Sequence, residues 1–167
     1  MSGGFEIRAL GIAIRPLDLP RFDAELADIF EVSLVAFAAS PYYTPLDFTT
    51  FREMYDPVRP LIDPGFVLMA RNAAGRLVGF QLAFPDPLSA EDGRPRRIIV
   101  KTIATVPDAR GTGLGNHMFD RIHQLARERG YRGAIHALMH VTNSSMRMSG
   151  RYGTEIFRRY ALYEWTP

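Results

Sequence analysis

A glycine-rich turn between a predicted strand and the most regular helix of the chain constrains the fold more than any other segment. The turn, Arg110-Gly111-Thr112-Gly113-Leu114-Gly115, follows an apolar strand over 98–106. Apolar residues then recur at helical spacing over 114–126, and Gly130 marks the helix end. Glycines let the backbone approach a ligand, and the unpaired amides of a helix N-terminus attract anions. The segment therefore predicts a phosphate-binding cradle, with a ligand-free strand-to-helix turn as the alternative.

Two nucleotide-binding motifs do not fit this turn. A dinucleotide fingerprint would need glycine where Asn116 stands, and no acidic residue follows at a strand end about 20 residues later. A P-loop would need Gly-Lys followed by Ser or Thr, which the chain lacks. The turn thus predicts that a phosphate-bearing small molecule binds through neither of these two motifs. A nucleotide-phosphate enzyme of a different fold remains an alternative.

Composition narrows the class of protein. A length of 167 residues predicts one domain over 1–167. The chain has no cysteine, which excludes disulfides, a cysteine nucleophile and thiolate-bound zinc, and its four histidines show no metal-binding spacing. We therefore expect no metal. The sequence shows neither an apolar run of about 18 residues nor a secretory leader, so we expect a cytoplasmic protein with no membrane partner.

Charge is distributed unevenly along the chain. Residues 1–83 carry 7 Arg against 10 acidic residues (net −3), whereas 84–167 carry 12 Arg and Lys101 against 8 acidic residues (net +5). This excess is small for a nucleic-acid surface, and the basic half lacks interleaved aromatic residues, so we expect no nucleic-acid partner. A polyanionic small molecule fits better, and a solvated basic surface is the plain alternative.

Hydrophobic periodicity predicts the order of strands and helices. Helical spacing covers 20–37, 48–55 and 114–129, and a short polar helix is expected over 143–152. Strands are predicted over 7–15, 66–71, 77–84, 98–106, 134–139 and 155–165. The resulting order, β-α-α-β-β-β-α-β-α-β, predicts an α/β (α+β) protein with a mixed sheet and helices on its faces.

At these residues the sequence resembles the GNAT superfamily of acyl-CoA-dependent N-acyltransferases. The pyrophosphate loop of that family has Arg or Gln, two variable residues, Gly, one variable residue, and Gly or Ala, and residues 110–115 match it. The preceding Ile103-Ala104-Thr105-Val106-Pro107 resembles the family's fourth strand, and the order of elements agrees over nearly the whole chain. The resemblance implies a mixed, mostly antiparallel sheet with helices on both faces.

The resemblance also implies which residues contact the cofactor. Ile103, Ala104 and Thr105 would offer backbone groups to the pantetheine arm of acetyl-CoA, in the opening between the fourth and fifth strands. The amides of the loop would hold the pyrophosphate, from Arg110, Gly111, Thr112, Gly113, Leu114 and Gly115. Asn143, just after the predicted fifth strand, would hydrogen-bond the pantetheine arm, although it could equally cap the next helix.

The catalytic residues are harder to assign, because this chain departs from the family. Gly150 stands seven residues after Asn143, where the family usually has a tyrosine as general acid. Tyr152 is the nearest tyrosine, but two residues along a helix turn it by about 200°, so packing is its more ordinary role. We rank His140 first as general base, ahead of His136 of the same predicted strand parity, with an ordered-water route as the alternative.

The expected function follows from this resemblance. It is direct transfer of an acetyl group from acetyl-CoA to a primary amine of a small molecule or peptide, with Tyr42 and Tyr43 as candidate acceptor contacts. The absence of cysteine excludes an acyl-cysteine intermediate. A non-catalytic acyl-CoA-binding or sensor module is the alternative, suggested by Gly150 and by the lack of glutamate in 98–106. The long last strand would leave an uncovered edge, which a homodimer could complete.

Overall fold

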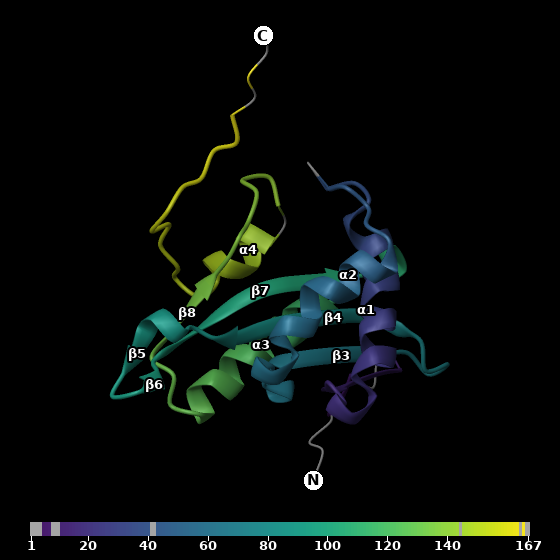
Figure 1. Cartoon of the computed structure of the whole chain (residues 1–167), viewed down its shortest axis with the longest axis horizontal. Helices are drawn as coiled ribbons and strands as arrows, with labels where there is room; N and C mark the ends of the chain where they lie inside the picture. Colours follow the sequence, from purple (N-terminus) through teal and green to yellow (C-terminus); the bar gives the residue numbers. More distant parts are fainter. Residues whose placement is uncertain (1–4, 8–10, 41–42, 144, 164, 166–167) are drawn as a thin grey trace.

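The computed structural model describes residues 5–7, 11–40, 43–143, 145–163 and 165 (Figure 1). Within these residues the main sheet has six strands in the order β1-β2-β3-β4-β7-β8. The strands are Phe5–Ile7 (β1), Ile12–Pro16 (β2), Val67–Arg71 (β3), Leu77–Pro85 (β4), Arg97–Thr105 (β7) and Gly133–His136 (β8). Neighbouring strands are antiparallel from β1 to β7, and β8 alone joins in parallel. The predicted mixed, mostly antiparallel sheet is confirmed.

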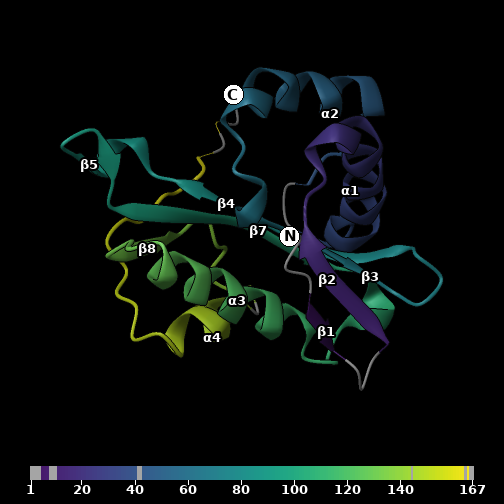
Figure 2. The ribbon, with the colours of Figure 1, turned by 90° about the horizontal axis from the view of Figure 1, so that it is seen from below.

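Helices cover both faces of this sheet, as expected. One face carries Phe22–Phe37 (α1) and Phe48–Tyr55 (α2), and the other carries Leu114–Glu128 (α3) and Ser145–Gly150 (α4) (Figure 2). The stretch between β4 and β7 forms a small separate hairpin of Ala90–Glu91 (β5) and Arg94–Pro95 (β6). Short 3-10 turns occupy Leu19–Arg21, Asp56–Leu61, Pro64–Phe66, Pro87–Ser89 and Pro107–Ala109.

Two apolar layers hold the helices to the sheet. Under α3, Leu114, Met118 and Ile122 are fully buried against strand residues such as Ile14 and Ile98. Their spacing of four residues is the helical period seen in the sequence, and each buried side chain stabilises the fold by about 1.5–3 kcal/mol. Under α1, the second layer includes Phe22, Leu26, Met69, Phe80 and Ala104. Because β3 and β4 are covered on both sides, they are apolar almost throughout.

The predicted last strand is wrong. Residues 155–163 and Trp165 are exposed and form no strand, although their alternating apolar residues are typical of one. Alternation shows only that a segment could pair, whereas a strand also needs a partner, and this segment pairs with none of the described strands.

Three other expected boundaries also change. The predicted strand 7–15 is instead a hairpin of β1 and β2, with Gly11 at a φ of +58° before β2. The predicted buried strand 134–139 ends at His136, and Leu138 is 70% exposed. The predicted helix 143–152 is shorter, at Ser145–Gly150.

Candidate active site

Strand β7 is paired on both edges along only half of its length. Its first half pairs with β8 from Arg97↔Gly133 to Val100↔His136, and the amide of Ala137 adds a last bond to the carbonyl of Val100 at 3.1 Å. On its other edge β7 pairs with β4 up to Thr105. Residues 101–105 therefore have one backbone edge without a strand partner among the described residues. The three predicted backbone ligands, Ile103, Ala104 and Thr105, all lie in this open half.

The glycine loop follows directly and carries backbone conformations that only glycine adopts readily. Gly111 has a φ of +77° and Gly113 a φ of +87°, and Gly113 is the N-cap of α3. A Cβ atom at Gly111 would have no neighbour within 4 Å, and one at Gly113 would meet only Nδ1 of His117 at 3.8 Å. The surface over the loop is therefore open.

The amides of this loop are available to an anion. No side chain caps α3 through its N-cap residue, and the amide of Leu114 has only a long contact of 3.4 Å with Oγ1 of Thr112. The other loop amides without an acceptor among the described residues belong to Gly111, Thr112, Gly113 and Gly115. Because such amides also lie at the positive end of the helix dipole, the loop suits a phosphate group.

The start of α3 lies close to the open half of β7. A Cβ atom at Gly115 would lie 3.7 Å from Cδ1 of Ile103 and 3.8 Å from Sδ of Met148. On β4, a Cβ atom at Gly79 would lie 3.0 Å from the carbonyl oxygen of Ala104 and 3.2 Å from Cδ2 of Leu114. Gly79 therefore permits the close approach of α3, a role we did not predict. A glycine alone inside a strand is the sequence signal that could have shown it.

Arg110 is placed differently from the glycines. Its amide donates to the carbonyl of Pro107 at 3.0 Å, and its guanidinium donates to the carbonyl of Ala36 at 2.8 Å. The side chain thus reaches the last turn of α1, where a cation is favourable. Its contact with phosphate stays a prediction, and the structure adds a bond from the loop to the opposite layer of helices.

Asn143 and His140 lie in the exposed segment between β8 and α4. Oδ1 of Asn143 accepts from the amide of Ser145 at 3.1 Å, which is the helix-capping alternative. That bond leaves Nδ2 as the donor for a ligand, so the pantetheine contact stays a prediction. Nδ1 of His140 lies 2.8 Å from Oγ1 of Thr142 and 3.4 Å from the amide nitrogen of Thr142, and the role of His140 as general base stays a prediction.

A buried pair of histidines joins α3, β8 and α4. Nδ1 of His123 donates to the carbonyl of Phe119 at 2.8 Å, so Nε2 of His123 must accept from Nε2 of His136, also at 2.8 Å. Oγ of Ser149 then donates to Nδ1 of His136 at 2.5 Å. Burial, together with the neighbouring His123, lowers the pKa of His136 to about 4, and burial also lowers the pKa of His123. The sequence ranks His136 behind His140 and gives no sign of the pairing, because the partners lie on different elements.

Tyr152 packs on α3. Its ring stacks on His123 with centroids 4.1 Å apart, and its hydroxyl donates to Oδ1 of Asp120 at 2.5 Å. Burial and this bond raise the pKa of Tyr152 to about 12, which makes it a weak proton donor. Its role as an acid stays a prediction. At Gly150, a Cβ atom would meet nothing within 4 Å, so the position of the usual family tyrosine is sterically open.

Of the two tyrosines predicted to contact the acceptor, Tyr42 lies outside the described residues. Tyr43 is half-buried beyond the end of α1, with its ring 6.1 Å from that of Phe37. In the same helix, α1, Phe30 packs against Phe48 and Phe51 of α2, with centroids 5.4 and 5.2 Å apart. These aromatic residues hold α2 on α1, and the contact of Tyr43 with the acceptor stays a prediction.

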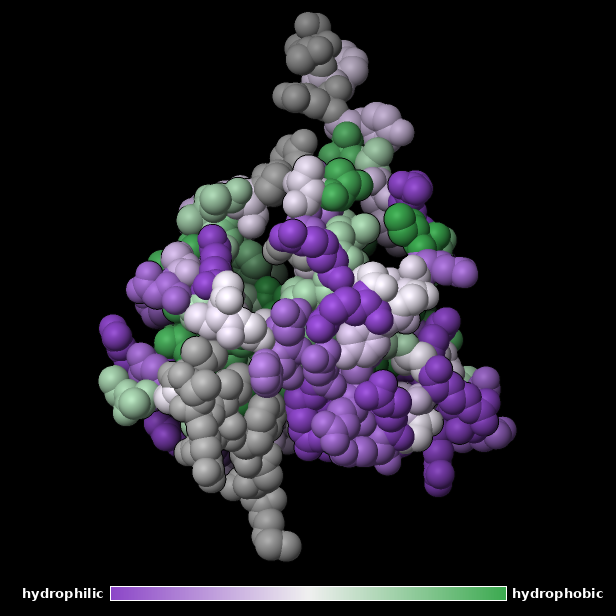
Figure 3. Space-filling model, turned by 180° about the vertical axis from the view of Figure 1, so that it is seen from behind, coloured by the Kyte–Doolittle hydropathy of each residue, from purple (hydrophilic) through white to green (hydrophobic). Residues whose placement is uncertain are grey.

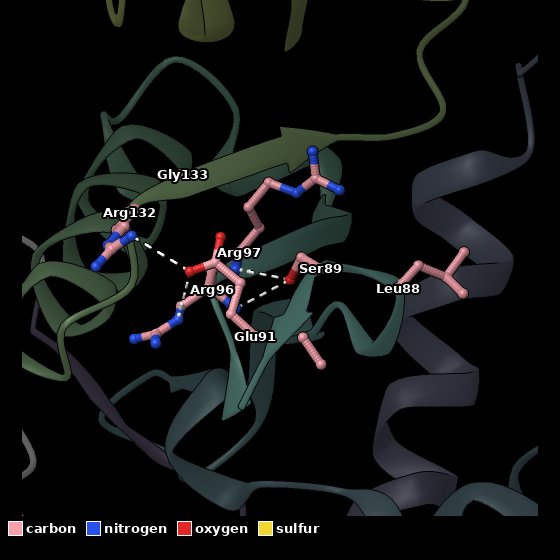
Figure 4. A pocket seen from close by; sticks show the side chains of 8 residues that line it. Leu88, Ser89, Glu91, Arg96, Arg97, Arg132 and Gly133 are labelled. Carbon is pink, nitrogen blue, oxygen red and sulfur yellow. Dashed lines mark hydrogen bonds and ion pairs between the residues drawn. The ribbon is translucent and has the colours of Figure 1, made fainter. Parts of the chain in front are cut away.

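A pocket of about 440 Å³ lies at the opposite end of β7 from the glycine loop (Figure 4). Its arginines are engaged with carboxylates: Arg96 and Arg132 with Glu91 at 3.2 and 3.4 Å, and Arg97 with Asp86 at 3.1 Å. This pairing leaves little positive charge for a ligand, so we do not assign the pocket to the phosphate-bearing molecule.

Two other kinds of site are missing from the described part of the chain. It contains no cluster of three or more His, Cys, Asp or Glu side chains that could hold a metal ion. None of its helices combines the length and the apolar character needed to cross a membrane.

Solved structures share this fold. An aminoglycoside acetyltransferase from an uncultured soil metagenomic sample, in complex with sisomicin, has a TM-score of 0.62 and 14% identity, covering 97% of this chain and 99% of that one. A ribosomal-protein-alanine N-acetyltransferase from Brucella melitensis biovar Abortus 2308 has a TM-score of 0.58 and 17% identity, with coverages of 92% and 99%.

A third similar structure contains coenzyme A. This diaminobutyrate acetyltransferase from Paenibacillus lautus, in complex with L-2,4-diaminobutyric acid and coenzyme A, has a TM-score of 0.59 and 16% identity, with coverages of 84% and 74%. At these identities the likeness shows the fold alone. No curated protein is a significant sequence match. The profile of the acetyltransferase (GNAT) family, however, matches residues 27–153. With a match over most of its length, the chain belongs to the acetyltransferase (GNAT) family.

Proposed function

We propose that this protein is an N-acetyltransferase that moves an acetyl group from acetyl-CoA directly to a primary amine of a small molecule or peptide. The observation that carries the proposal is the open glycine loop, in which Gly111 and Gly113 leave several amides without acceptors beside the open half of β7. This combination fits a ligand with a pyrophosphate at one end and an amide-bearing chain at the other.

Each end of the ligand has a matching part of the site. The loop amides and the start of α3 hold the pyrophosphate. The free backbone edge of Ile103 to Thr105 pairs with the pantetheine amides as an added strand would. Acetyl-CoA supplies the thioester carbon that the amine attacks. Holding acetyl-CoA in position for the incoming amine is the main catalytic contribution we assign to this chain.

The proton of the amine is assigned to His140 or to ordered water. An amine of pKa about 10.4 is mostly protonated at pH 7 and needs an acceptor for its proton. His140 is the proposed acceptor, directly through Nε2 or through ordered water. No side chain at position 150 donates to the leaving sulfur, but a thiol of pKa about 8.5 departs tolerably well as a thiolate.

A binding test separates this proposal from its rivals. We expect micromolar calorimetric binding of acetyl-CoA and free CoA, and none of ATP. Gly113→Glu should abolish CoA binding, because the side chain fills the cradle and sets a negative charge against the phosphates. The substitution also costs about 1–2 kcal/mol of stability, because residue 113 is left-handed.

Gly75→Glu is the matched control for that cost. Like Gly113, Gly75 has a left-handed backbone, with a φ of +77°, and open space around it. It lies, however, in the turn between β3 and β4. It should lose similar stability and keep full CoA affinity. If both variants bind CoA equally, the loop assignment is wrong. ATP binding without CoA binding would instead favour a nucleotide-phosphate enzyme.

A second candidate function is a non-catalytic acyl-CoA sensor, favoured by the bare Gly150 and by the engagement of Tyr152 with Asp120. An acetylation screen over amines and amino-terminal peptides decides between the two. If one amine makes the protein release the free thiol of CoA faster than acetyl-CoA is hydrolysed without that amine, the result supports the acetyltransferase. Tight CoA binding without turnover on any amine supports the sensor.

A further inference from the structure

We propose that Lys101 is a modification site: its side-chain amine takes the acetyl group from acetyl-CoA bound to the same chain, so that the protein acetylates itself at this residue. The inference rests on the proposed binding of acetyl-CoA and adds to it a site on the chain itself. It does not depend on which other amine the protein accepts.

Lys101 is the only lysine of the chain, and the other basic side chains apart from histidine are all arginines. An arginine guanidinium stays protonated in proteins, whereas the lysine amine is a usual target of acetylation. Figure 3 shows a broad hydrophilic surface, and none of it, Lys101 apart, can offer a lysine amine. The chain therefore has a single side chain that can form an acetyl amide.

The pairing of β7 singles out the same residue. Two successive residues of β4 pair with Val100 and Thr102, so Lys101 between them has no partner on that strand. On the other edge, pairing with β8 ends at Val100. Lys101 is thus the one residue of β7 that pairs with neither of its described neighbouring strands. It stands where β8 leaves β7 and the open half begins.

The skipped residue is a β-bulge, which changes the direction of nearby side chains. Val100 is buried in the layer under α3, and Ile103, three residues later, packs against the same layer. Residues three apart on a regular strand point to opposite faces, so the strand changes phase at residues 101 and 102. Bulges of this kind re-aim a side chain and are frequent next to active sites.

The side chain of Lys101 is exposed, and none of the ion pairs among the described residues includes it. In the proposed function, the pyrophosphate lies at 110–115 and the pantetheine amides lie along 103–105. The sulfur follows the last amide after an ethylene link, so the thioester lies beyond Ile103 in the direction of Lys101. Two residues of strand span about 7 Å, a distance that the four-carbon stem of lysine can cover. An amine held so close to a thioester reacts at a high effective concentration.

Protection of the strand edge is the other role that a charged residue could have here. Lys101 is the only charged residue in 98–106, and a charge on an open edge discourages pairing with another chain. Arginine would supply the same charge, and arginine stands at every other basic position of this kind. Edge protection therefore does not account for an amine at position 101.

The step is a simple acyl transfer. A bond forms between Nζ of Lys101 and the acetyl carbon, and the bond from that carbon to the CoA sulfur breaks. The ammonium group loses two protons in all, of which one goes to the sulfur and the other to water. The products are uncharged acetyl-lysine and free CoA.

Endoproteinase Lys-C gives a direct readout, because it cleaves after lysine but not after acetyl-lysine. The full-length protein is incubated with acetyl-CoA or with free CoA, then denatured and digested. We expect cleavage into 1–101 and 102–167 after free CoA, and loss of this cleavage after acetyl-CoA. The peptide that contains residue 101 should then carry the mass of one acetyl group. If the purified protein already carries this group, Gly113→Glu prepared alongside should not.

The matched control moves the only lysine elsewhere. Lys101→Arg/Arg127→Lys places it at an exposed position in the last turn of α3. At a rise of 1.5 Å per residue, this position lies about 20 Å from the glycine loop. The relocated lysine should stay cleavable. Equal protection at both positions would show acetylation by dissolved acetyl-CoA and would overturn the proposal.

A mixture of two variants tests transfer within one chain. Gly113→Glu keeps Lys101 but should not bind CoA, whereas Lys101→Arg keeps the glycine loop but offers no lysine. After incubation of the mixture with acetyl-CoA, the Gly113→Glu chain should remain cleavable. Its acetylation would show transfer between chains and would contradict the placement of Lys101 beside the thioester of its own chain.

Calorimetry on the same preparation separates this inference from the proposed function. Bound acetyl-CoA together with a chain that stays cleavable would overturn the modification site alone and leave Lys101 as an edge-protecting residue. Absence of both binding and protection would overturn the proposed function as well. Binding together with protection of the wild-type chain, and not of the relocated lysine, is the result we expect.

Discussion

The two faces of the sheet are held by polar clusters of opposite character. On the α1 face, Glu25 is buried and accepts from Arg15 at 2.6 and 3.0 Å and from Arg71 at 3.0 Å. On the α3 face, His123, His136 and Ser149 form a neutral chain of hydrogen bonds. The first cluster is ionic and joins a helix to the edge of the sheet. The second is uncharged at neutral pH and positions α4 beside the proposed cofactor site.

The difference shows how burial is balanced on each face. Burial alone would raise the pKa of Glu25, but the hydrogen bonds and charges of Arg15 and Arg71 outweigh it, so the pKa is lowered. Among the described residues, no carboxylate forms such a bond with the histidines, and burial lowers their pKa values instead. The α1 layer therefore keeps its charges down to low pH, whereas the α3 layer is sensitive to mild acid.

Glu25→Gln should have the largest effect on stability. It removes the charge that both arginines share, and breaking a buried ion pair costs about 3–5 kcal/mol. We expect a value near the lower limit, because Arg15 and Arg71 keep 31% and 20% exposure and can be partly hydrated. Urea unfolding measures the change. Asp28→Asn is the control: its pair with Arg71 is 44% exposed on the Asp28 side and should contribute less than about 1 kcal/mol. Similar losses for both variants would contradict this reading of the cluster.

Acid should act first on the α3 face. His136 has a folded pKa of about 4 against about 6.5 when unfolded, so the unfolded chain binds more protons between these values. Stability should be constant above about pH 7 and fall as the pH decreases from about 6.5 to 4, by an amount on the order of 2 kcal/mol. Arg127 opposes and Asp120 favours the charge on the neighbouring His123.

Urea unfolding at several pH values measures this loss. His136→Gln should flatten the profile in that window, whereas His140→Gln, at the exposed histidine of the same region, should leave it unchanged. Loss of stability confined to pH values below about 4 would assign the acid sensitivity to carboxylates such as Glu25 instead.

Asn116→Asp should change stability and binding in opposite directions. The residue is exposed in the first turn of α3, where a carboxylate stabilises the helix by about 0.3–1 kcal/mol. The same charge opposes the pyrophosphate, and we expect about tenfold weaker CoA binding, or about 1.4 kcal/mol. Calorimetry measures the affinity, and Asn72→Asp, in the turn between β3 and β4, is the control. Unchanged affinity at position 116 would place the phosphates away from this end of the helix.

Gly150→Tyr should have the smallest effect and sharpens the assignment of the acid. Because a Cβ atom at position 150 meets nothing within 4 Å, we expect the fold to accept the side chain. A phenol there would supply the proton donor that the family usually has, and kcat should rise by roughly threefold, less than 1 kcal/mol. Gly150→Phe controls for the helical propensity and bulk. An equal rise for both variants would show that the gain is structural.

Local patterns predicted the elements that depend on neighbours in the chain. The spacing of apolar residues predicted the extent of α3, because buried residues recur about every four positions along one face of that helix. The loop at 110–115 was predicted as glycine-rich, and Gly111 and Gly113 do have left-handed backbones, which glycine alone adopts without strain. The predicted strand 155–165 failed because its alternation contains no information about a partner edge.

Contacts between distant residues could not be predicted in the same way. The bond from Arg110 to Ala36, the pair of His123 and His136, and the close approach at Gly79 each join elements far apart in the chain. Amino-acid order alone determined the glycine turn, the helical periods and the family to which they belong, since these follow from neighbouring residues. Only the tertiary structure decided that β8 leaves half of β7 open, that two histidines form a hydrogen bond, and that the last segment finds no partner strand among the described residues. Each of these depends on which surfaces folding brings together.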